Sequence, residues 1–108
     1  MIKLASETID KKDTKQLINW LKTNPKLTQG DLTIKFEKKF AKWIGSKYAV
    51  FCNSGSSANL LMLSALLEKN IIKEKSSIVV PSICWSTDIA PILQLNLNPI
   101  LCDVDIKN

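Results

Sequence analysis

Three short apolar runs separated by helical patterns constrain the fold of this chain more than any other feature. The runs Tyr48–Cys52, Ser77–Val80 and Ile100–Val104 end at polar or proline-containing turns and predict buried strands. Between them, Ala58–Glu68 is apolar nearly all round and predicts a buried helix, and Trp85–Leu95 predicts a shorter one. Strands that alternate with helices need crossover connections. We therefore predict an α/β fold with a mostly parallel or mixed sheet and helices on both faces.

The first 45 residues predict helices and no strand. Asp10 can cap a helix that stops before Thr23–Pro25. After a loop, Phe36, Phe40 and Trp43 follow helical spacing, and Gly45 suits the C-terminal end of that helix.

Composition excludes several classes of protein. The 108 residues are 45% hydrophobic and 23% charged, which is typical of a folded chain of about one small domain. No stretch is apolar and long enough to cross a membrane, and the N-terminus lacks a signal-peptide core, so we expect a cytoplasmic protein. The net charge is +5, but every basic residue is a dispersed lysine. This pattern favours a solvated surface and no nucleic-acid partner.

The cysteines do not predict a metal site. Cys52, Cys84 and Cys102 lie far apart, no C-x-x-C pair occurs, and the chain has no histidine. We expect three buried, reduced thiols, no disulfide and no metal.

The small polar turn after the first apolar run is a candidate phosphate site. Asn53–Ala58 joins a predicted strand to the start of a helix, where the first N–H groups lack internal partners and favour an anion. Gly55 would let a ligand approach the backbone, and the serine hydroxyls add donors. The alternative is an ordinary serine-rich helix cap.

A second candidate site follows the next predicted strand. Trp85 stands in the polar turn after Ser77–Val80, and ligands of open α/β sheets bind at the carboxyl ends of strands. An aromatic side chain beside a phosphate site would suit a planar phosphorylated cofactor. The alternative is that Trp85 is a core aromatic residue.

Six sequence blocks in this order resemble the N-terminal part of the DegT/DnrJ/EryC1/StrS sugar aminotransferases. The blocks are Thr28–Gly30, Phe36–Ala41, Tyr48–Val50, Asn53–Leu61, Val80–Thr87 and Pro99–Asp105. The resemblance implies a pyridoxal 5'-phosphate (PLP) enzyme with the large domain of the aspartate aminotransferase fold, known as fold type I. It covers the chain from about Leu4 to Asp105.

The resemblance also implies roles for individual residues. The turn Gly55, Ser56 and Ser57 would hold the cofactor phosphate, and Trp85 would stack on the pyridine ring. Thr28, Gln29 and Gly30 would lie near a sugar-nucleotide site.

The resemblance further implies that residues 1–108 are the N-terminal portion of one PLP-binding domain. Residues 1–45 would form a helical arm with the substrate loop, and residues 46–108 would begin the sheet and carry the phosphate turn. The lysine that forms the Schiff base would lie beyond position 108. Lys69 and Lys73 do not match its motif. We therefore expect an N-terminal fragment that is inactive alone and belongs to a homodimer.

By resemblance, the enzyme transfers an amino group from glutamate to a nucleotide-linked keto-deoxysugar for lipopolysaccharide or another surface polysaccharide. One alternative is a sugar-nucleotide dehydratase of the same family, a branch with His at the lysine position. The Gly55–Leu61 block resembles this branch, whereas Ser82–Thr87 resembles the aminotransferases. A non-catalytic module that binds a phosphorylated ligand is another alternative.

Overall fold

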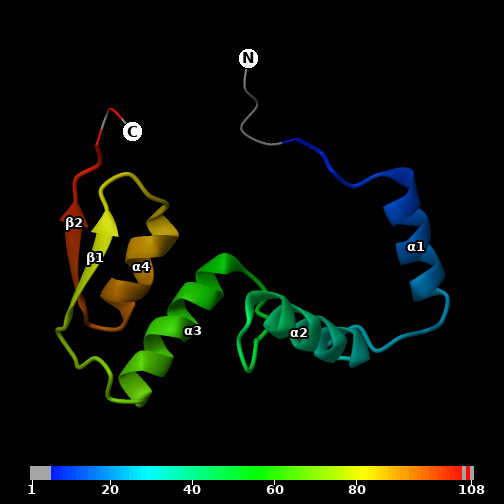
Figure 1. Ribbon diagram of the computed structural model, residues 1–108, viewed down its shortest axis with the longest axis horizontal. Helices are drawn as coiled ribbons and strands as arrows, with labels where there is room; N and C mark the ends of the chain where they lie inside the picture. Colours follow the sequence, from blue (N-terminus) through cyan, green and yellow to red (C-terminus); the bar gives the residue numbers. More distant parts are fainter. Residues whose placement is uncertain (1–5, 106, 108) are drawn as a thin grey trace. The chain divides into compact units, whose positions relative to one another are not determined.

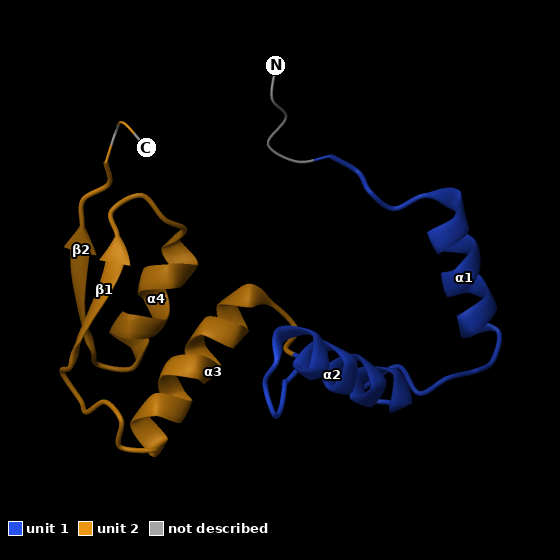
Figure 2. Cartoon of the chain, viewed as in Figure 1, with its two compact units in different colours: residues 1–51 blue, residues 52–108 orange. Residues whose placement is uncertain are grey.

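The computed structural model describes residues 6–105 and 107, and the chain divides into two compact units. The units comprise residues 1–51 and residues 52–108 (Figure 2). No helix in the described part of the chain has the length and apolar character needed to cross a membrane.

The first unit begins with α1, Lys11–Leu21, whose start is fixed by Asp10 as predicted. One carboxylate oxygen of Asp10 accepts hydrogen bonds from the N–H groups of Lys12 and Asp13, at 2.7 and 2.9 Å. In return, Asp13 accepts the N–H of Asp10 at 3.1 Å. This reciprocal capping satisfies donors that the first turn of a helix would otherwise leave open.

The second helix of this unit, α2, spans Asp31–Ile44 and ends at Gly45, as the spacing of its aromatic residues predicts. Gly45 adopts a left-handed φ of 76°, which a residue without a Cβ tolerates. The ring of Phe36 meets that of Phe51 edge to face, with centroids 5.5 Å apart. Ala41 is the buried residue of this helix.

The predicted strand Tyr48–Cys52 is wrong, because no strand is present there. Instead, the N–H of Phe51 donates to a carboxylate oxygen of Glu37 on α2, at 2.9 Å. An apolar run becomes a strand only when a neighbouring strand takes up its backbone groups. In the described part of the chain, no neighbouring strand does so.

The second unit has the order α3 (Gly55–Glu68), β1 (Ser77–Pro81), α4 (Ser86–Gln94) and β2 (Asn98–Cys102) (Figure 1). The strands β1 and β2 are parallel, with Ser77 opposite Asn98, and α4 provides the crossover between them. This confirms the predicted α/β class, although the described sheet has two strands where three were expected. The second strand also begins two residues earlier than Ile100.

The core of the second unit is small. It is built on Leu63, Val80, Ile92 and Leu97, and Ile92 is almost completely enclosed. The expectation that α3 is a buried helix is wrong, because Leu63 is its only buried residue in the described chain. Among the helices and strands described, α3 contacts α4, and its Leu61 and Met62 side chains remain exposed.

One face of the sheet is also uncovered. Val79 of β1 and Ile100 of β2 are paired neighbours, and their exposed fractions are 66% and 49%. The opposite face of β1 packs Val80 into the core beneath α4. Parallel sheets are ordinarily covered on both faces, so this layer is incomplete in the described chain.

Candidate functional site

The predicted phosphate turn is the first turn of α3. The helix begins at Gly55, three residues earlier than Ala58, because the Ser54 side chain caps it. The Ser54 hydroxyl oxygen accepts the N–H of Ser57 at 3.2 Å and donates to the Ser57 hydroxyl at 3.1 Å. Ser54 therefore acts as a helix cap, which was the alternative. Whether the turn can also bind a phosphate depends on the N–H groups of Gly55 and Ser56.

The N–H groups of Gly55 and Ser56 remain available. Within the described residues, neither has a hydrogen-bond partner, and both residues are exposed. A Cβ placed on Gly55 would meet nothing within 4 Å. Two donors at the positive end of a helix are thus exposed, an arrangement that suits a phosphate group.

Trp85 stands directly before α4 and is 77% exposed, so it is not a core aromatic residue. Its backbone N–H donates to a carboxylate oxygen of Asp88 at 3.2 Å. The N–H of Asp88 returns a hydrogen bond to the carbonyl of Trp85 at 2.9 Å. The backbone of Trp85 is therefore held, while its indole ring stays accessible to a planar ligand.

Asn59, the residue that follows the first turn of α3, is hydrogen-bonded to the first turn of α4. Its side-chain nitrogen donates to the Asp88 carboxylate at 3.0 Å and to the carbonyl oxygen of Thr87 at 3.3 Å. The structure thus brings the Gly55–Ser57 turn and Trp85 to the same end of two packed helices. The sequence argument expected them at the ends of two neighbouring strands, but the first of these strands is absent. Sequence reasoning missed Asn59 and Asp88 as residues of this site. The signal for Asn59 is a polar side chain in an apolar helix, and the signal for Asp88 is an acidic residue in the first turn of α4.

The predicted substrate loop belongs to the first unit. Thr28 and Gln29 are exposed, and Gln29 has a left-handed φ of 41°. Gly30 is required by close packing, because a Cβ there would lie 2.8 Å from the carbonyl oxygen of Lys26. An apolar hollow of about 300 Å³ adjoins this loop, and its aromatic lining comes from Trp20, Phe36 and Phe51.

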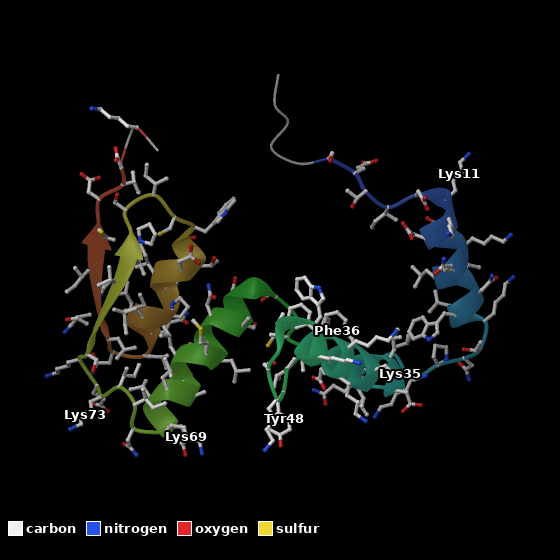
Figure 3. All side chains as sticks on the ribbon, in the orientation of Figure 1. Lys11, Lys35, Phe36, Tyr48, Lys69 and Lys73 are labelled. Carbon is white, nitrogen blue, oxygen red and sulfur yellow. The ribbon has the colours of Figure 1, made fainter. Side chains whose placement is uncertain are left out.

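The lysines near the site by sequence lie far from it in the fold. Lys69 directly follows the last residue of α3, and Lys73 lies in the loop beyond it (Figure 3). A 14-residue helix is about 20 Å long, so both are at the end of α3 opposite Gly55.

In the described part of the chain, no cluster of three His, Cys, Asp or Glu side chains could hold a metal. Cys52 and Cys84 are half-buried, but Cys102 is exposed, so the prediction of three buried thiols is wrong.

Comparison with protein families gives one match over nearly the whole chain. Residues 7–108 match the model of the DegT/DnrJ/EryC1/StrS aminotransferase family.

Two curated relatives differ in the reaction that their names describe. Over 106 residues, the chain is 40% identical to GDP-4-keto-6-deoxy-D-mannose 3-dehydratase of Yersinia pseudotuberculosis. The identity to GDP-perosamine synthase of Caulobacter vibrioides is 27% over 104 residues. In each comparison the alignment covers 96% of this chain and 27% of the relative, so the chain spans about a quarter of their length.

Among solved structures, the chain resembles a GDP-4-keto-6-deoxymannose-3-dehydratase crystallised with a trapped PLP-glutamate geminal diamine. The TM-score is 0.84 at 40% identity, over 96% of this chain and 27% of that one. This similarity confirms the predicted fold type I class.

Proposed function

Since the chain belongs to the DegT/DnrJ/EryC1/StrS aminotransferase family, we propose that its second unit is the cofactor-binding front of a PLP-dependent sugar-nucleotide enzyme. In this proposal, the N–H groups of Gly55 and Ser56 hold the cofactor phosphate, with the hydroxyls of Ser56 and Ser57 as further donors. The exposed ring of Trp85 stacks on the pyridine.

The observation that supports this assignment best is the open first turn of α3. Gly55 and Ser56 offer two N–H donors without partners in the described chain, and the space that a Cβ on Gly55 would fill is empty. Asn59 and Asp88 tie this turn to the turn that carries Trp85. A phosphate and an aromatic ring on one small molecule match such a pair of sites.

For the reaction, we propose removal of a hydroxyl group from a GDP-linked 4-keto-6-deoxysugar. The aminotransferase expectation from sequence is less well supported, because the identity is 40% to the 3-dehydratase and 27% to the GDP-perosamine synthase. Glutamate remains the proposed source of the amino group on the cofactor, since the related dehydratase structure contains it bound to PLP.

The residues of this chain bind and orient, and none of them is proposed to react. When bound, PLP supplies an electron sink for bonds next to an amine. Gly55, Ser56 and Trp85 fix its phosphate and ring. We keep Thr28, Gln29 and Gly30 as proposed contacts of the sugar nucleotide, and a cytoplasmic homodimer as the proposed assembly. The reacting lysine or histidine is expected beyond residue 108.

The experiment uses the full-length protein that carries this sequence. It is incubated with PLP, [¹⁵N]glutamate and GDP-4-keto-6-deoxymannose, and the sugar products are analysed by mass spectrometry. We expect a deoxygenated sugar that contains no ¹⁵N. A sugar that carries ¹⁵N would replace the dehydratase with the aminotransferase. Binding of PLP without any conversion of the sugar would favour the non-catalytic module instead.

A further inference from the structure

We propose that Asn59 and Asp88 form a positioning clamp that sets the spacing between the phosphate turn and Trp85. The proposal rests on the proposed function, because the two places matter together only for a ligand that reaches both. It goes further by assigning a role to two residues that do not contact the ligand.

The geometry of the clamp is specific. The Asp88 carboxylate accepts from Asn59 with one oxygen, at 3.0 Å, and from the N–H of Trp85 with the other, at 3.2 Å. Asn59 also reaches the carbonyl of Thr87 at 3.3 Å. The Asn59 side chain of α3 therefore holds both the backbone of the first turn of α4, at Thr87, and the Asp88 carboxylate that fixes Trp85.

The clamp is the polar link between two turns that lie far apart in the sequence. Asn59 and Asp88 are separated by 29 positions, and both are half-buried. Leu63 of α3 and Ile92 of α4 belong to the same apolar core. Apolar packing tolerates small sliding of one helix along another, whereas hydrogen bonds with two fixed acceptors define one register.

A rigid spacing benefits only a ligand that occupies both places. When two parts of a ligand bind to prepositioned partners, the second contact forms with little additional entropic cost. PLP has a phosphate for the α3 turn and a ring for Trp85. Pyridoxal has only the ring, and inorganic phosphate has only the anion. Loosening the clamp should therefore weaken PLP much more than either part.

The test compares these three ligands on the full-length protein that carries this sequence. Dissociation constants for PLP, pyridoxal and inorganic phosphate are measured by isothermal titration calorimetry, for the unsubstituted protein and for Asn59→Ala. We expect PLP to bind about tenfold more weakly, as for loss of one net hydrogen bond. Pyridoxal and phosphate should change less than about twofold.

Two further variants separate positioning from folding. Asp88→Asn has nearly the same shape, but it keeps one acceptor oxygen for two donors. It should weaken PLP binding less than Asn59→Ala does, and it should leave the affinities for pyridoxal and phosphate unchanged. Asn98→Ala is the matched control. The side-chain nitrogen of Asn98 also donates to a backbone carbonyl, that of Lys75, at 2.7 Å, but it lies at the opposite end of the sheet. It should leave all three affinities unchanged.

Each outcome decides the proposal. Equal weakening of all three ligands in Asn59→Ala and Asp88→Asn would mean a merely structural role and would overturn the clamp. So would an unchanged affinity for PLP. If the unsubstituted protein fails to bind PLP at all, the proposed function falls as well, which distinguishes its failure from that of the clamp alone.

Discussion

Replacing Trp85 with alanine should separate cofactor binding from stability. The side chain is 77% exposed, so less than a quarter of its surface is buried in the chain. A tryptophan that is fully buried covers up to about 250 Å². The buried part of Trp85 is then about 60 Å², and its loss should cost at most about 1.5 kcal/mol of folding free energy.

The same substitution should also weaken the binding of PLP, because the stacking partner of its ring is lost. Stacking of a planar ring on an aromatic side chain is worth about 1–3 kcal/mol by alanine substitution, which corresponds to a loss of about 5- to 150-fold in PLP affinity. The affinity is measured by equilibrium dialysis of PLP, and stability by urea unfolding followed by circular dichroism. Trp85→Phe, which keeps an aromatic face, should recover most of the affinity.

Trp43 provides the matched control. It is 80% exposed on α2, in the other unit, and it has no role in the proposed cofactor site. Trp43→Ala should leave PLP affinity unchanged. The stacking role would be refuted if Trp85→Ala bound PLP as tightly as the unsubstituted protein, or if the two alanine variants lost the same affinity.

Three other substitutions test different parts of the account. Gly55→Ala should change the free energy of unfolding by less than about 0.5 kcal/mol, since the added Cβ meets nothing within 4 Å. In calorimetry the variant should bind PLP about tenfold more weakly, because the methyl group obstructs the N–H donors. An unchanged affinity would argue against phosphate binding at this turn. Ile92→Ala should destabilise the second unit by about 2–5 kcal/mol in urea unfolding, because Ile92 is 1% exposed at the centre of a small core; a cost below 1 kcal/mol would contradict that packing. Gly30→Ala should shift the loop before α2, because the Cβ would lie 2.8 Å from the carbonyl oxygen of Lys26. Limited proteolysis should then cut this loop faster. An unchanged rate of cleavage would show that the loop accommodates the Cβ.

Local patterns predicted most of the secondary structure. Helix α2 follows from the spacing of Phe36, Phe40 and Trp43, and its end follows from Gly45. Strand β1 and helix α4 lie within one or two residues of their predicted bounds. These elements depend on periodicity and on capping residues, which the sequence displays directly.

The errors concern features that depend on distant partners. Tyr48–Cys52 is as apolar as β1, but a strand needs a neighbour, and here Glu37 takes the N–H of Phe51 instead. The apolar pattern of α3 predicted burial, yet burial depends on what packs against a helix. At the site, the phosphate turn and Trp85 were proposed from local sequence. The link between Asn59 and Asp88 spans 29 residues, so no local pattern pairs these two side chains.

The amide signal of Gly55 tests most directly whether the first turn of α3 holds the cofactor phosphate. It is followed in ¹H–¹⁵N NMR spectra of the full-length protein, labelled with [¹⁵N]glycine. If the first turn of α3 holds the phosphate, adding PLP or inorganic phosphate should shift the Gly55 signal, whereas pyridoxal should shift it little. Gly45, in the other unit, should not respond and serves as the internal reference. A Gly55 signal that stays in place while the protein binds PLP would contradict the assignment of this turn to the phosphate.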